Sequence, residues 1–127
     1  MILPYLFLAP SPKGGKGVYT SKNIKAGTTI EISPVLIFMK EEAALIEKTK
    51  LHNYVFEWGN NKKKRALGLG YISMYNHHFN ANCIYEMDFV ENTMGIITIK
   101  PIKKGEELFI NYNATPNDTK PLWFKAK

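Results

Sequence analysis

Turn-forming residues interrupt this chain at short intervals, and this spacing constrains the fold more than any other feature of the sequence. The stretches between the turns are rich in Ile, Val, Thr, Phe and Tyr, which favour β-strands. Apolar and polar side chains alternate over residues 84–89, as in a strand with one buried face. We therefore expect a mainly β domain whose short strands form small sheets, including residues 17–20, 28–32, 35–38, 84–90, 94–99 and 108–110.

Residues 41–50 depart from this pattern. They are rich in helix-forming residues, with Glu41 and Glu42 at the start and Lys48 and Lys50 at the end. Acidic residues at the start of a helix and basic residues at its end complement the helix dipole. We expect one short helical insert at about residues 41–50.

Length and composition are those of one globular domain spanning residues 1–127. The single cysteine, Cys83, cannot form an internal disulfide, which favours a reducing cytoplasm. The apolar start, Met1 to Ala9, lacks a basic segment and contains Pro4, so we interpret it as a buried first strand and not as a signal peptide.

The formal net charge is +6, and the densest basic cluster is Lys62-Lys63-Lys64-Arg65. A positive balance favours acidic partners. Surface lysine runs are common without any partner, so we expect a solvated loop here, with nucleic-acid contact as the minor alternative.

Three segments are irregular enough to suggest chemistry. The first, Lys13-Gly-Gly-Lys-Gly17, precedes an apolar strand. Glycine allows a ligand to approach the backbone closely. The spacing fits neither a Walker loop nor a dinucleotide fingerprint, and a plain hairpin turn is the alternative.

The second segment, Gly68 to Asn82, carries two glycines, three asparagines and two histidines. Asparagine often stabilises turns, so a structural loop is one interpretation. Neither a zinc site of His77, His78 and Cys83 nor a nucleophilic Cys83 is supported, because no second pair of ligands and no activating arrangement can be identified.

The third segment, Lys104 to Asn113, predicts a turn and a short strand that ends at Tyr112. Glu106 and Glu107 are adjacent on this strand and must point to opposite faces, so they cannot act together on one substrate. We expect a surface or turn role for at least one of them.

Taken together and in this order, the three segments resemble the SET family of protein-lysine methyltransferases. Lys13 to Ile30 resembles the opening stretch of the family, Tyr75 to Asn82 its Asn-His-Ser-x-x-Pro-Asn signature, and Gly105 to Tyr112 its Gly-Glu-Glu-Leu-x-x-Asp-Tyr signature. The likeness covers roughly residues 11–115. The chain departs from the signatures at His78, Ala81 and Asn111, and it lacks the cysteine-rich segments that bind zinc in many relatives.

The resemblance implies a SET-type β-clip of several small curved sheets with one short helix and a C-terminal pseudoknot. It also implies methyl transfer from S-adenosylmethionine to a lysine ε-amine of a protein substrate, without a metal. Tyr112 corresponds to the catalytic tyrosine, which we expect to be protonated and to act by orientation and electrostatics. The residues implied in cofactor binding are Lys16, Gly17, Tyr75, Asn76 and His77.

The resemblance places Tyr54, Ile110 and Trp123 along the substrate channel. Tyr54 could equally be a core aromatic residue, and Trp123 or Phe124 could simply dock the C-terminal tail of about residues 113–127. Ile110 stands where the family often has Phe or Tyr. It offers no hydroxyl to restrain the amine, so we expect products beyond monomethyl-lysine.

Two alternatives to an active methyltransferase are a SET-like lysine-binding module without turnover and a small basic nucleic-acid-binding protein. The altered signature positions favour the first, whereas the second explains the charge but leaves the motifs unused. The expected location is cytoplasmic, or nuclear if the source is eukaryotic. We expect no membrane association.

Overall fold

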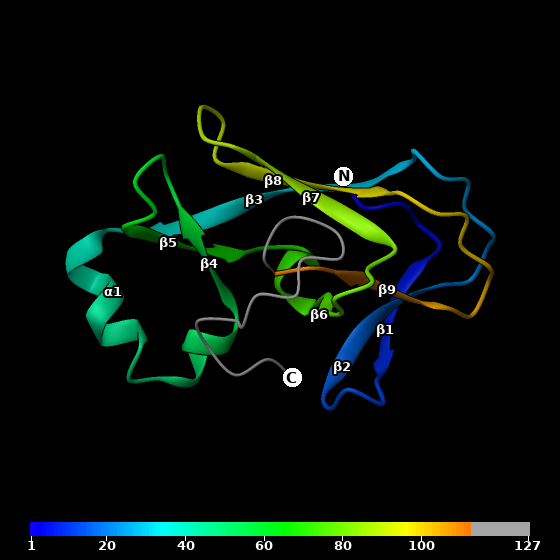
Figure 1. Cartoon of the computed structure of the whole chain (residues 1–127), viewed down its shortest axis with the longest axis horizontal. Coiled ribbons are helices and arrows are strands. Elements are labelled where there is room, and N and C mark those ends of the chain that lie inside the picture. Colours follow the sequence, from blue (N-terminus) through cyan, green and yellow to red (C-terminus); the bar gives the residue numbers. More distant parts are fainter. Residues whose placement is uncertain (113–127) are drawn as a thin grey trace.

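The computed structural model describes residues 1–112 and consists of short strands with little helix (Figure 1). The strands are β1 Leu6–Pro10, β2 Lys16–Thr20, β3 Thr29–Phe38, β4 Val55–Trp58, β5 Lys64–Gly68, β6 Asn76–His77, β7 Cys83–Asp88, β8 Thr93–Thr98 and β9 Glu107–Ile110. The helical elements are α1 Lys40–Ile46 and two 3₁₀ turns, η1 Lys50–Asn53 and η2 Ile72–Met74. The predicted mainly β class is confirmed.

The larger sheet has five strands in the order β4-β5-β3-β8-β7. Its centre is the ten-residue strand β3, which pairs with β8 along its first half and with β5 along its second half. Because the partner changes along one continuous strand, the two halves of the sheet need not share a plane, and the sheet curls.

Residue Pro34 shows where the sequence prediction was wrong. We expected a turn at Ser33-Pro34 between two strands, but β3 continues through this point. Proline has a backbone angle that suits extended chain, and it lacks only the N–H donor. Pro34 lies where pairing passes from β8 to β5, so the missing donor is tolerated there.

The smaller sheet has four strands in the order β1-β2-β9-β6. The last strand of the described chain, β9, lies inside this sheet, antiparallel to β2 and parallel to β6 (Figure 1). Parallel pairing sets Asn76 opposite Phe109 and His77 opposite Ile110. The Asn82 side chain extends this contact, because it accepts from the Phe109 amide at 2.8 Å and donates to the Glu107 carbonyl at 3.0 Å.

The expected helix at residues 41–50 is shorter in the structure. Helix α1 ends at Ile46, and Lys50 begins the separate turn η1. Thr49 causes the break, because its backbone is extended and its hydroxyl accepts from the amide of Leu51 as an N-cap. The α1 face that carries Ala43 and Ile46 is buried.

The two sheets share one apolar core, in which Val18, Ile30, Met94, Ile96 and Leu108 have no exposed surface. Each side chain of this size contributes roughly 1.5–3 kcal/mol when fully buried. No helix within residues 1–112 is long and apolar enough to span a membrane.

The basic cluster is only partly a loop. Lys62 and Lys63 are exposed in the turn between β4 and β5, as expected. Lys64 and Arg65, however, begin β5 and are half-buried, so the loop prediction was wrong for them. The strand alternation separates the two side chains, and Arg65 turns to Glu47 beyond α1, at 3.9 Å.

Candidate active site

Parallel pairing of β6 with β9 brings the end of the Gly105–Tyr112 segment against residues 75–77. The Tyr112 hydroxyl donates a hydrogen bond of 2.7 Å to the carbonyl oxygen of Tyr75. The Tyr112 amide donates one of 3.0 Å to Nδ1 of His77. Two segments 35 residues apart in sequence are thus joined at both the backbone and the side chain of Tyr112.

Aromatic rings surround the Tyr112 side chain. The Phe56 ring contacts it edge-on with centroids 5.9 Å apart, and Tyr85 donates its hydroxyl to the Tyr112 carbonyl at 3.2 Å. Burial raises the pKa of Tyr112 well above its ordinary value, and the neighbouring Tyr54 and Tyr85 act in the same direction. The phenol is therefore protonated at neutral pH, and it can orient a ligand but is a poor base.

His77 is buried and neutral. Its pKa is lowered to about 4, chiefly because burial penalises the imidazolium, with nearby Lys13 and His78 adding to the effect. Because Nδ1 accepts from the Tyr112 amide, the proton of the neutral ring lies on Nε2. That Nε2 atom has no partner in the described part of the chain.

Asn76, like His77, has one buried side-chain atom without a hydrogen-bond partner among residues 1–112. Its Nδ2 donates to Glu107 Oε2 at 2.8 Å and to the Lys16 carbonyl at 3.3 Å, whereas its buried Oδ1 has no partner among residues 1–112. A buried acceptor without a partner is costly, and such groups often belong to ligand sites.

Gly17 packs directly against this pair of side chains. A Cβ at position 17 would overlap the Glu107 carboxylate and would come within 2.9 Å of Asn76 Nδ2. Only glycine fits here. The Lys16 side chain is exposed, so its backbone is what the structure brings to Asn76.

The open edge of β6 adds backbone groups to the site. β6 is an outer strand of its sheet, and the His78 amide donates to the Ile110 carbonyl at 3.0 Å. Peptide groups alternate in direction along a strand, so the N–H and C=O of His77 face away from β9, toward the edge without a neighbouring strand.

The side chain of Tyr75 lies in the core, although the signature implied a role for this residue in cofactor binding. Its ring is fully buried, and its hydroxyl donates to Glu31 Oε1 at 2.8 Å. The side chain is thus committed to the core, and only the Tyr75 backbone is near Tyr112. Ile110 is also fully buried in the core, two residues before Tyr112. Trp123 lies outside the described residues.

Tyr54 lies close enough to Tyr112 to influence its pKa. It follows η1, and its carbonyl accepts from the Ser73 hydroxyl at 2.7 Å. The structure therefore brings Tyr54, Asn76, His77 and Gly17 together around Tyr112 and Glu107, while Ile110 and the Tyr75 ring lie beneath them in the core.

Sequence reasoning missed three residues that shape this site. Tyr85 is half-buried beside Tyr112, and only its place in an alternating strand gave any signal. Glu31 is a buried carboxylate that accepts from the Tyr71 amide and the Ser33 hydroxyl as well as from Tyr75. Burial raises its pKa.

Glu107 is the third missed residue. Its carboxylate accepts from the hydroxyls of Ser11 and Tyr19 as well as from Asn76. Its neighbour Glu106 is exposed and accepts from the Lys103 amide at 2.6 Å. Glu106 precedes β9 and is exposed, whereas Glu107 begins the strand and is buried, so the predicted turn role belongs to Glu106.

The three departures from the signature have structural roles. Nδ1 of His78 accepts from the Asn80 amide at 2.9 Å, and Ala81 is buried. Asn111 is buried and donates to the Phe79 carbonyl at 3.3 Å. The hydrogen bonds of His78 and Asn111 thus lie in the loop after β6.

The unpaired atoms fit the cofactor that the resemblance implies. S-adenosylmethionine offers ammonium and amino donors suited to Asn76 Oδ1, and acceptor atoms suited to the Nε2–H of His77. Gly17 is buried, and the absence of a side chain there leaves room for the Glu107 and Asn76 side chains. No group of three or more metal-ligating side chains was found within residues 1–112.

Comparison with known proteins gives consistent matches. The family model described as SET domain matches residues 15–113. A protein of Schizosaccharomyces pombe, histone-lysine N-methyltransferase, H3 lysine-37 specific, is 38% identical over 121 residues, which are 94% of this chain and 77% of that protein.

Solved structures agree. A candidate histone methyltransferase of Plasmodium falciparum superposes with a TM-score of 0.69 at 29% identity, over 87% of this chain and 98% of that one. A Polycomb Repressive Complex 2 chain from Chaetomium thermophilum gives a TM-score of 0.73 at 21% identity, over 92% of this chain and 16% of that one. The second match shows the fold alone.

Proposed function

This chain belongs to the SET-domain family of protein-lysine methyltransferases, and from that premise we propose that its methyl acceptor is a histone lysine. The reaction itself follows from the family: methyl groups pass from S-adenosylmethionine to the ε-amine of a lysine in a protein. The histone assignment is supported by the fission-yeast relative, whose name specifies lysine 37 of histone H3 and which aligns with nearly the whole chain.

The chemistry requires little covalent participation by the protein. S-adenosylmethionine supplies the methyl group on a sulfonium, which is already a good leaving group. The protein must hold the lysine nitrogen in line and keep it neutral, because an ammonium has no lone pair. The surroundings of the Tyr112 hydroxyl are buried, and burial disfavours a charged amine because it lowers the pKa of lysine.

Tyr112 provides orientation. Its hydroxyl is protonated and donates to the Tyr75 carbonyl, which fixes the position of the Tyr112 oxygen. A fixed oxygen at this place stabilises positive charge during transfer without gaining a proton. This hydrogen bond, which joins the two signature segments, is the observation that carries the assignment of Tyr112 as the catalytic residue.

Asn76, His77 and Gly17 would hold the cofactor. Asn76 offers its buried oxygen, and His77 offers Nε2–H and the outward backbone of β6. Gly17 leaves the room that the Glu107 and Asn76 side chains occupy. The Glu107 carboxylate orients Asn76 so that its oxygen, and not its amide nitrogen, is left for the ligand. Tyr75 and Lys16 would contribute through their backbones.

We further propose that the enzyme adds more than one methyl group. Ile110 is packed beneath the site and has no hydroxyl with which to restrain a partly methylated amine. Mass spectrometry of the product would detect di- or trimethyl-lysine. A strictly monomethylated product at full conversion would contradict this part of the proposal.

Histones are assembled on DNA in the nucleus, so of the two expected locations we propose the nuclear one for a eukaryotic source, and we test both proposals together. Labelled S-adenosylmethionine should transfer its label to recombinant histone H3, and the Tyr112→Phe variant should not transfer it. Imaging of the tagged protein in its own cell should show nuclear signal.

Labelling of other proteins with H3 unlabelled would refute the histone proposal and leave the methyltransferase assignment standing. Cofactor binding without transfer to any protein in the panel would instead favour a SET-like module without turnover.

A further inference from the structure

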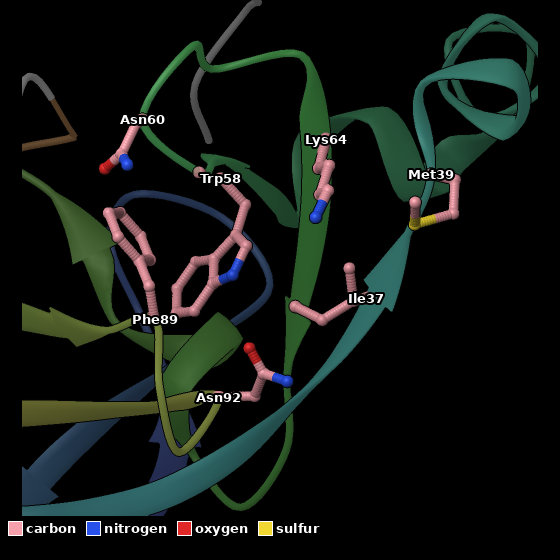
Figure 2. A pocket seen from close by; sticks show the side chains of 8 residues that line it. Ile37, Met39, Trp58, Asn60, Lys64, Phe89 and Asn92 are labelled. Atoms are coloured by element: carbon pink, nitrogen blue, oxygen red, sulfur yellow. The ribbon is translucent and has the colours of Figure 1, made fainter.

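A hollow of about 430 Å³ opens between the end of one strand and the turns of two hairpins, and no residue of the group around Tyr112 lines it. Figure 2 shows the side chains of its lining. Its walls come from the end of β3, the hairpin β4–β5 and the turn β7–β8. A volume of this size is large enough for a side chain of a partner. We call it the docking pocket, and define it by Ile37, Met39, Trp58, Asn60, Lys64, Phe89 and Asn92.

The floor of the docking pocket is apolar. Trp58 is only 2% exposed, and the Phe89 ring meets it edge-on with centroids 4.9 Å apart. Phe89 and Met39 are 43% and 48% exposed and stand at the side of the hollow. A buried tryptophan with exposed apolar side chains around it is the arrangement expected of a protein-binding site.

Polar groups surround this floor without side-chain partners in the part of the chain that the structure describes. Asn60 and Asn92 stand on opposite turns at the opening, and the Lys64 ammonium points into the hollow (Figure 2). Within residues 1–112, none of these three side chains makes a hydrogen bond or an ion pair. Two amides can bind the backbone of an extended peptide, and the ammonium can bind a carboxylate.

The charge at the opening is positive. Lys64 is the charged residue among those that line the pocket, and the exposed Lys62 and Lys63 precede it in the same hairpin. On the facing turn, Asp88 is also charged, but its Oδ1 accepts from the amides of Val90 and Glu91, and it makes no ion pair with a described residue. The Glu91 side chain is exposed and makes no ion pair with a described residue.

We propose that the docking pocket binds an acidic segment of a partner protein, with one apolar side chain packed on Trp58 and a neighbouring carboxylate paired with Lys64. A nucleic-acid backbone has no apolar group that would fill the floor. A second copy of this chain would bring two positive openings together, which costs free energy.

The docking pocket lies close to the candidate methyl-transfer site along strand β4. Phe56 and Trp58 are two residues apart on β4 and therefore on the same face. Phe56 contacts Tyr112, and Trp58 lines the pocket about 7 Å further along the strand. A partner held in the pocket would lie next to the methyl-transfer site.

The test is fluorescence anisotropy with a labelled peptide of Asp and Glu residues around one Leu, added to the whole protein. Lys64→Glu and Phe89→Ala should each weaken binding about tenfold or more. The matched charge reversal Lys104→Glu, in the turn before β9, should leave affinity unchanged. Replacing the peptide Leu by Ala should also weaken binding about tenfold.

Thermal melting would show whether Phe89→Ala folds, and the exposed Met39→Ala provides a second apolar test. Three results would overturn the proposal. They are equal binding of a peptide with Gln in place of its acids, binding that Lys64→Glu does not change, and displacement of the peptide by duplex DNA. Self-association that Phe89→Ala abolishes would also overturn it, in favour of a second copy.

Discussion

The Tyr112 hydroxyl lies 2.7 Å from the carbonyl oxygen of Tyr75 and donates a hydrogen bond to it. The Tyr112 amide donates at the same time to His77, so both ends of this residue are fixed to the segment around β6. The ring is therefore fixed in one orientation before any ligand binds. Such preorganisation is how a catalyst that acts by positioning gains rate.

Tyr112→Phe should therefore lose activity while the protein stays folded. Without the oxygen, methyl transfer should fall by at least about a hundredfold. The Tyr75 carbonyl loses its donor, which should lower the free energy of unfolding by about 1 kcal/mol. Radiolabel transfer and urea denaturation measure the two effects, and full activity in this variant would refute the catalytic role.

Gly17→Ala should weaken cofactor binding by displacing the side chains that pack against Gly17. The added Cβ would overlap the Glu107 carboxylate, and relief would have to displace Asn76. Overpacking of this kind costs about 1–3 kcal/mol. We expect lower stability together with weaker binding of S-adenosylmethionine in a calorimetric titration.

Gly95→Ala is the matched control for this change. A Cβ at position 95 would lie 3.6 Å from the Glu31 carbonyl and 3.7 Å from Ile32, which is ordinary contact. Since glycine weakens a strand, this variant should be neutral or slightly more stable. If both substitutions lowered stability and cofactor binding equally, the close contacts at position 17 would not be the cause of the loss.

Glu107→Gln should lower stability and cofactor binding more than the same substitution at Glu106. The Glu107 carboxylate accepts from three side chains, and an amide –NH₂ in its place would face at least one of these donors. We expect a loss of about 1–3 kcal/mol in unfolding free energy and weaker cofactor binding, because Asn76 would no longer be held.

The paired control is Glu106→Gln. Glu106 is exposed, and glutamine can still accept from the Lys103 amide. Thermal melting and calorimetry on both variants would settle the comparison. If Glu106→Gln proved the more harmful, the buried hydrogen-bond group around Glu107 would not be what orients Asn76.

The class of fold and the location of the site could be predicted from the sequence because both depend on local features. Turn residues and alternating strands indicated a mainly β domain, and the asparagine-histidine and glycine-glutamate segments indicated where the candidate site lies. Their contact depends on parallel pairing of β6 with β9, which no local pattern predicts. Only the family resemblance suggested it.

The misses have physical causes. Pro34 looks like a turn residue, but a proline fits a strand wherever the pairing changes partner. Thr49 ends a helix that the composition would have extended. Glu31 and Tyr85 look like polar residues of ordinary strands, and their importance depends on side chains that are distant in sequence, Tyr75 and Tyr112.

His77 should make stability depend on pH. Its folded-state pKa is about 4, below the ordinary value of about 6.5. Between these values the unfolded chain binds a proton at His77 and the folded chain does not, so the contribution is complete above about pH 6.5 and is lost as the pH falls toward 4. Protonation would also remove Nδ1 as the acceptor for the Tyr112 amide, so activity of the folded protein should fall only as the pH approaches about 4.

His77→Gln isolates this effect from other titrating groups. Glutamine can accept from the Tyr112 amide, but it does not titrate. Urea denaturation of both proteins between about pH 4 and 6.5 should give a smaller loss of stability for the variant than for the native chain. Parallel curves would mean that His77 binds its proton equally well in both states, and its buried neutral form would then have no part in the pH response.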